Sequence, residues 1–516
     1  MNKLRLQVLT QEQQNHQRTF REHAFKLEEM MPARAVADQL LDLYLATFET
    51  TYRILHVPTF RQQYETFWTT GAVDMVFLAK LLASMAASCC FYSPAIKLED
   101  GEPLYQAGAR WLIAVQSWVA SVFVGSKIDM DMLQVLCLIS IARQTDATEG
   151  DVTFVASGSL TRSAMVTGLH RDPSRFCSPC KFWAEQRRRL WASVVELELQ
   201  SSVDAGMVPG IDLDQCDIAA PSTWDDAELK EGMAAYPSPT AAEDRAAGVT
   251  TRTDTLALLS RSLPVRLRIA RMVNNLRFTL SYDEALRLSD ELLRYLDQGV
   301  ALFHRDEAGR LPFARSFYIF IMRRSLLVLH RPFCYSALQT PKFTYSRKVC
   351  LESSMEVLSL LEENASPHLG QLAGSMFQYE FLHAAISVCI ELRLQMEEKS
   401  PLKELVQAQQ TVMLRAVRRT VDALKSRLTP DGKGCKAFTF ISLIVASVEA
   451  RLRGDDAVMA VKEASSHAVK HCREVMNSRV PGVSLFFPAF FDDIIANSNS
   501  NSHPDSSIRT STHDGL

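Results

Sequence analysis

The sequence predicts an all-α protein: a large multi-helix domain with flexible N- and C-terminal ends. Apolar residues recur at steps of three and four in segment after segment, and short polar connectors separate these segments. The alternation of apolar and polar residues that marks a half-buried strand does not occur over any long stretch. A succession of helices without strands is typical of an all-α fold.

The same periodicity predicts the individual helices. We expect helices over residues 35–60, 73–92, 104–123, 129–144, 159–169, 178–204, 254–276, 282–296, 313–329, 346–362, 369–396, 406–427, 435–452 and 456–475. Pro264 predicts a kink or break in its helix, and Pro332 should end the preceding one, with Phe333 packing back into the core. Residues 221–252 have few large apolar side chains, so we expect a surface loop there.

Composition limits the classes of protein to consider. The chain has 516 residues, 47% of them hydrophobic, enough for one large or two ordinary domains. Its longest apolar stretches, 111–125 and 437–448, are too short to span a bilayer, and no secretory signal opens the sequence. Eleven cysteines without framework spacing predict free thiols in a reducing compartment. A net charge of −3 gives no overall electrostatic attraction to nucleic acid, so any DNA contact must use a local patch.

The segment 158–221 is the one around which we expect the other helices to pack. Its long helix carries a stripe predicted to be buried, formed by Trp183, Leu190, Val194, Leu197 and Ser201. Three successive arginines, 187–189, lie on the same helix, where neighbouring residues are rotated by about 100° and so cannot share one face. We therefore expect them to bind carboxylates and loop carbonyls of the protein rather than to grip phosphate.

Several motifs in this segment and beyond carry a family resemblance. They are Gly168-Leu169-His170-Arg171, Arg187-Arg188-Arg189-Leu190-Trp191, a helix end at Gly206, His330-Arg331-Pro332-Phe333, and the stretch 52–60 upstream. In order and spacing they resemble the middle homology region of fungal zinc-cluster transcription factors. The resemblance covers roughly residues 36–480, and it implies a structural role for the motif residues.

We expect three parts. The resemblance implies the fungal transcription factor regulatory domain over 36–480. Composition predicts a flexible leader over 1–35 and an aromatic and acidic segment with a disordered tail over 481–516. Family members carry an upstream zinc cluster of six closely spaced cysteines, whereas the first cysteine here is Cys89. We therefore assign no cofactor to this chain; zinc would require a cluster that the sequence lacks. Truncation, a regulator acting through protein partners, and a diverged role all remain open as explanations.

The resemblance implies a fungal transcription regulator in the nucleus, controlling a metabolic or biosynthetic gene set such as one for secondary metabolism. The expected protein partner is either the transcription machinery or a family member. A small-molecule effector is also expected, and binding to a membrane is not. DNA is a further candidate, although the chain has no DNA-binding motif. The alternative is a regulatory module without DNA contact that dimerises with complete family members or titrates them.

Catalytic and metal-binding patterns are weak. The sequence has no glycine-rich phosphate loop, nucleophile elbow or His-Glu-x-x-His helix, so we expect no enzyme. The Cys177–Cys180 pair and the cluster of His467, His471 and Cys472 have metal-like spacing, but without further ligands both are expected to be structural.

Aromatic and acidic residues are mixed near the C-terminus. The residues concerned are Phe486, Phe487, Phe490, Phe491, Asp492 and Asp493. We expect the phenylalanines to dock on the domain, because burial stabilises each by about 1.5–3 kcal/mol. The same mixture also fits an activation segment, in which the acids keep the aromatics in water until a partner's groove binds them.

Overall fold

A computed structural model of the chain describes residues 27–123, 128–146, 150–175, 180–233, 251–277, 280–304, 311–337, 340–362, 368–397 and 402–477. Within these ranges there are 16 α-helices, several short 3-10 helices and no β-strand, which confirms the all-α fold class. By their internal contacts the residues form two compact units, one ending at Arg427 and the other beginning at Leu428.

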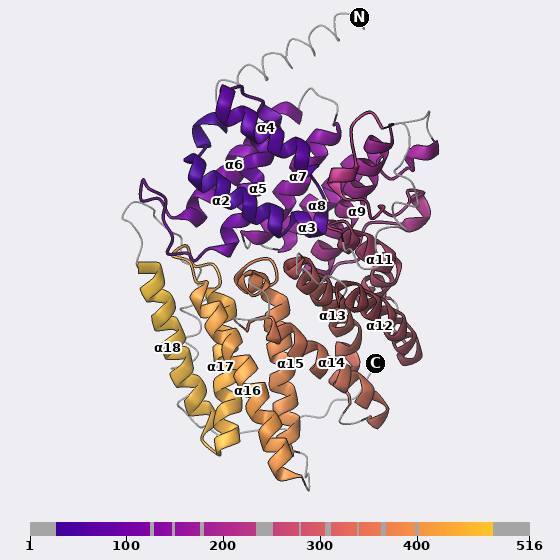
Figure 1. Cartoon of the computed structure of the whole chain (residues 1–516). Helices are drawn as coiled ribbons and strands as arrows, with labels where there is room; N and C mark the ends of the chain where they lie inside the picture. The colour runs from indigo at the N-terminus through magenta and orange to yellow at the C-terminus, as the bar shows by residue number, and fades with distance from the viewer. Residues whose placement is uncertain are drawn as a thin grey trace, which may run out of the picture. The chain divides into compact units, whose positions relative to one another are not determined.

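The first half of unit 1 is a layer of helices around α5. Its helices are α2 (Arg34–Ala46), α3 (Glu49–Tyr52), α4 (Val57–Thr70), α5 (Met75–Ser88), α6 (Leu104–Phe123), α7 (Met130–Thr145), α8 (Gly150–Val166) and α9 (Lys181–Asp204). From Phe77 onward every residue of α5 is buried, because α2, α6 and α7 all pack against it (Figure 1). Asp74 begins this helix by accepting hydrogen bonds from the backbone N–H groups of Val76 and Phe77.

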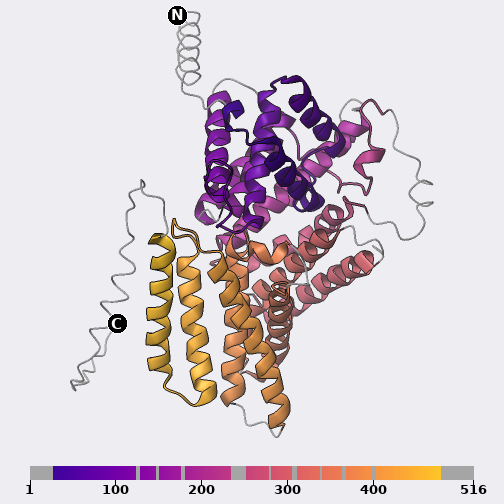
Figure 2. The same cartoon turned by 60° about the vertical axis from the view of Figure 1, so that its left-hand side comes forward.

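The second half of unit 1 is centred on α13. Its helices are α11 (Asp254–Val273), α12 (Tyr282–His304), α13 (Pro312–Cys334), α14 (Thr344–Ser359), α15 (Gln378–Glu397) and α16 (Lys403–Ser426). Helix α13 packs against α11, α12, α14 and α3, and α15 packs against α14 and α16 (Figure 2). Helix α9 contacts α3, α7, α8 and α11, so it links both halves of this unit.

Unit 2 contains two described helices, α17 (Cys435–Arg453) and α18 (Ala457–Asn477), which pack along one another. Gly454 ends α17 with φ of 79°, a left-handed conformation that glycine adopts without strain, and the chain then turns back. No described helix of either unit is by itself long and apolar enough to cross a membrane; α4 together with Met75–Phe91, bent by 108°, passes only by length and composition.

One predicted element at the start of the chain is wrong. The single helix expected over 35–60 is three helices, because the backbone leaves the helical region twice. Thr47 has φ of −114° and ψ of −93° at the end of α2, and Arg53 has the left-handed φ of 45° at the end of α3. Pro58 lies in the first turn of α4, where the missing N–H has no helical partner to lose, so it starts a helix instead of ending one.

One expectation about prolines is also wrong, because α13 continues through Pro332 to Cys334. Helix α11 continues through Pro264 without a break, and the kink that was the other expected outcome there stays a prediction. Near Pro264 the carbonyl of Leu259 accepts hydrogen bonds from the side chains of Ser262 (3.0 Å) and Arg266 (2.7 Å). These bonds stabilise the turn before the proline, whose own lost backbone bond is the one to the carbonyl of Ser260. Pro332 lies in the last turn of its helix, so only Phe333 and Cys334 of α13 follow it.

The predictions for the central segment need three further corrections. Helix α8 begins at Gly150, nine residues before the expected Ser159. Trp183 is 44% exposed, so it does not belong to the buried stripe of α9. The expected surface loop after residue 221 is ordered up to 233 and buries Asp226 and Leu229; residues 234–250 lie outside the described ranges.

Candidate functional site

The site is built around α9 and begins at the turn that precedes it. Gly168, with φ of 72°, donates its N–H to the carbonyl of Met165, and Leu169 donates to that of Ala164, both at 2.9 Å. These two bonds form a Schellman motif that closes α8. The Arg187 guanidinium then donates to the carbonyl of Gly168 at 2.6 Å, which fastens α9 to the turn.

Arg188 binds the next part of the same loop. Its guanidinium donates to both carboxylate oxygens of Asp172, at 3.1 and 3.2 Å, and Asp172 also accepts from the backbone N–H groups of Ser174 and Ala219. Burial opposes ionisation, but the bonds from Arg188 and Ser174 hold the pKa of Asp172 well below its usual range. Asp172 therefore joins the loop, α9 and the segment after α9 as a charged group.

The third arginine of the triplet lies in a buried cluster. Asp226 binds Arg189 at 2.5 Å and also binds Arg53 of the first helical layer, and it accepts from the backbone N–H of Val57 at 3.0 Å. Burial disfavours the ionised form, but the charges of Arg53 and Arg189 hold the pKa of Asp226 well below its usual range. One carboxylate thus joins three segments that are far apart in sequence.

A second set of polar residues follows α9 toward its C-terminal end, at steps of four that place them on one face. Glu196 accepts two hydrogen bonds of 2.8 Å from Arg266 of α11 and one of 2.7 Å from Gln200. Gln200 in turn accepts from Arg324 of α13 at 2.6 Å, and Arg324 also pairs with Asp204. These buried polar groups, with partners on α11 and α13, lie on α9 in addition to the predicted stripe, of which Leu190, Val194, Leu197 and Ser201 are buried as expected.

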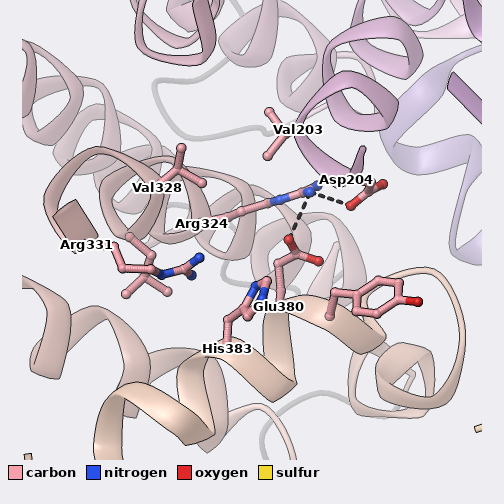
Figure 3. A pocket seen from close by; sticks show the side chains of 9 residues that line it. Val203, Asp204, Arg324, Val328, Arg331, Glu380 and His383 are labelled. Atoms are coloured by element: carbon pink, nitrogen blue, oxygen red, sulfur yellow. Dashed lines mark hydrogen bonds and ion pairs between the residues drawn. The ribbon is translucent and has the colours of Figure 1, made fainter. Parts of the chain in front are cut away.

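This polar ladder ends at a cavity of about 150 Å³ between α9, α13 and α15. Figure 3 shows Arg324 held between Asp204 and Glu380, and the Glu380 contact measures 2.9 Å. Arg331, one of the motif residues, and His383 extend toward the same space from α13 and α15 (Figure 3). The cavity is lined by Val203, Asp204, Arg324, Leu327, Val328, Arg331, Tyr379, Glu380 and His383.

Titratable groups in the cavity differ in charge. Burial, with the charges of Arg331 and Arg324, lowers the pKa of His383 to about 4, so its imidazole is neutral near pH 7. Burial raises the pKa of Asp204 to about 7, with Arg324 opposing the shift and Glu380 adding to it. Near neutral pH the imidazole of His383 is therefore uncharged, whereas Asp204 is paired with Arg324.

The remaining motif residues lie near these two centres. Leu190 and Trp191 are buried in α9, and the His170 ring lies 6.1 Å from that of Trp191. Gly206 closes α9 with φ of 63°, in a second Schellman motif. Two more residues belong to the His-Arg-Pro-Phe motif: His330 binds Ser346 through Nδ1 at 2.9 Å, and the half-buried ring of Phe333 lies 5.0 Å from that of Tyr282. Arg171 pairs with Asp217 at 3.1 Å.

Metal ligands do not gather anywhere in the described ranges: no group of three or more His, Cys, Asp or Glu side chains there could hold a metal ion. Cys180 donates weakly to the carbonyl of Met233 at 3.6 Å, and Cys177 lies outside the described residues. His471 lies 3.8 Å from Glu474, and Cys472 is buried. Within the described residues these side chains do not form a zinc cluster. The C-terminal phenylalanines and aspartates, 486–493, also lie outside the described residues.

Sequence reasoning missed most of the cavity. Among its residues only Arg331 belonged to a recognised motif. A usable signal was present, because Arg324 and Arg331 lie seven residues apart in one helix and therefore share one face. The polar residues Glu196, Gln200 and Asp204, four apart on α9, form a similar signal that the apolar stripe obscured.

Comparison with known proteins shows that the chain is similar to fungal transcription factors. Residues 41–243 match the model of the fungal specific transcription factor domain. The chain is 31% identical over 482 residues to transcription factor opdR of Penicillium oxalicum, covering 87% of this chain and 60% of that protein. It is 30% identical over 476 residues to transcription factor lepE of Aspergillus flavus, covering 88% and 56% respectively.

A more distant relative is the equisetin cluster transcription factor eqxF of Fusarium heterosporum, 25% identical over 425 residues, with 74% of this chain and 57% of that protein covered. The chain thus spans between 56 and 60% of the length of these relatives. No solved structure matches it.

Proposed function

Because the chain carries a fungal specific transcription factor domain within residues 41–243 and resembles fungal transcription factors over most of its length, we propose that it regulates transcription in the nucleus. The observation that carries this proposal is the similarity to opdR, which extends over 87% of the chain and far beyond the matched domain. The helical domain then acts as the regulatory part of the protein.

We further propose that the regulated genes form a biosynthetic set. The relative eqxF is named for the equisetin cluster, and this supports the same kind of target here. The polar ladder of α9 suggests how regulation would work. A ligand or partner that favours one packing of α9 against α13 and α15 shifts the population between two states, by no more than its difference in affinity for them.

The aromatic and acidic segment is the candidate output of the regulator. Its phenylalanines would enter an apolar groove of the transcription machinery, and Asp492 and Asp493 would keep the segment soluble before binding. A family member is a second candidate partner, and DNA requires a recognition surface that the described residues do not identify.

The full chain fused to a heterologous DNA-binding domain tests this function. A reporter with intermediate basal transcription reads activation and repression alike. We expect the fusion to change reporter transcription, and alanine at Phe490 and Phe491 to reduce the change. Alanine at Ser506 and Ser507 is the matched control in the same tail and should have no effect. A well-expressed fusion that leaves transcription unaltered would contradict the proposal and favour a module that acts by titrating other family members.

A further inference from the structure

The cavity at the end of α9 has the size and the polarity of a small-molecule site. Its volume is about 150 Å³, and a protein cavity of roughly that size can hold benzene, a molecule of six heavy atoms. Unlike a benzene site it has several polar side chains in its wall. On one side it reaches the surface at Tyr379, which is 52% exposed, so a ligand can enter without unfolding the domain.

Hydrogen-bonding capacity in the cavity is not used up by the protein. Among the described residues no partner lies within hydrogen-bonding distance of the buried Nε of Arg331, and the same is true of the buried Oε2 of Glu380. Burying such a group without a partner costs about 1–3 kcal/mol, and more when the group is charged. Both side chains line the cavity, so its wall contains one cation with an open donor and one carboxylate with an open acceptor.

The charges around the cavity favour an anion at Arg331. Arg324 is already shared between Asp204 and Glu380, so both wall carboxylates are paired with it. Arg331 has no such carboxylate within the part of the chain that the structure describes. His383 beside it adds no charge, and its ring can donate or accept one further hydrogen bond. A guanidinium in this position matches the two oxygens of a carboxylate.

We propose that this cavity binds a small carboxylate that also carries a hydrogen-bond donor, with Arg331 binding the carboxylate and Glu380 accepting from the donor. As the effector of the regulator, a role that rests on the proposed function, this ligand would connect α9, α13 and α15. Binding would fix the packing of α9 against α13, because Arg331 and Arg324 lie on one face of α13 and Arg324 already holds Asp204.

Three small probes separate the parts of the recognition. Lactate has the carboxylate and a hydroxyl donor, propionate lacks the hydroxyl, and 1,2-propanediol lacks the carboxylate. We expect lactate to raise the melting temperature of the purified 516-residue protein, propionate to raise it less, and propanediol to leave it unchanged. If propanediol matches lactate, or if no probe has an effect, the proposed recognition is wrong.

Substitutions in the cavity wall test whether lactate binds there. Arg331→Gln should weaken lactate binding at least about ten-fold in calorimetry, since it removes a charged hydrogen bond. Arg315→Gln, at an exposed position of the same helix, is the matched control and should bind as the parent does. Val328→Phe fills the cavity without changing its charge and should also prevent binding. Unaltered binding in both cavity variants would overturn the assignment.

The reporter assay distinguishes the proposed ligand site from the proposed function in transcription. If lactate binds the protein but Arg331→Gln leaves the reporter response of the fusion unchanged, the ligand site stands and its effector role fails. If the fusion regulates transcription but no probe binds, the site is wrong while the regulatory function stands.

Discussion

Replacing Asp226 by alanine is the sharpest test of the buried charge cluster. The side chains of Arg53, Arg189 and Asp226 are at most 5% exposed, so the substitution leaves two guanidinium groups buried without their shared carboxylate. Removing one partner of a buried pair costs about 3–5 kcal/mol. Because whole domains are stable by only about 5–15 kcal/mol, we expect a large fall in the urea midpoint of unfolding.

The control is Asp42→Ala. Asp42 pairs with Arg61 at 2.8 Å, a distance close to those in the cluster, but these side chains are 63% and 51% exposed. Water solvates both partners after the change, so the free energy of unfolding should alter far less. Equal effects of the two substitutions would refute the argument that burial makes the Asp226 cluster contribute strongly to the free energy of unfolding.

Two further predictions concern the packing of α9 and the dependence of the protein's stability on pH. Trp191→Ala should lower the free energy of unfolding by about 3–5 kcal/mol, because Trp191 is 5% exposed. Trp183→Ala, on the same helix but 44% exposed, should have little effect; similar melting of both variants would show that α9 is not buried as described. Acid should destabilise the protein through Asp172 and Asp226. Their pKa values are lower in the folded state, so the unfolded chain binds more protons and stability falls once the pH drops below about 4. In urea titrations between neutral and acid pH, Asp172→Asn should reduce this loss; an identical pH dependence would exclude the carboxylate as its source.

The apolar periodicity predicted a helix well where the residues within that helix determine its bounds. Helix α6 has the predicted bounds, and α7 differs from the prediction by one residue at each end. The predictions failed where contacts between segments distant in sequence determine where a helix ends. The break at Arg53 is stabilised because its guanidinium binds Asp226, 173 residues later in the sequence. The spacing of residues near Arg53 therefore cannot reveal its partner Asp226.

The candidate site was predictable only in part for the same reason. The arginine triplet was expected to bind loops and carboxylates, and Arg187 and Arg188 do contact the turn after α8. The cavity, by contrast, depends on Arg324 meeting Asp204, 120 residues away. Buried ion pairs lie among the apolar contacts of this core, and an apolar periodicity cannot reveal them.

The most direct test of the central claim is a comparison of all transcripts between the organism that encodes this chain and a strain in which the gene is deleted. A transcription regulator of a biosynthetic gene set should change a contiguous group of biosynthetic genes together, and restoring the gene should reverse the change. A transcript profile unaltered by the deletion, under conditions in which the protein is present, would contradict the account.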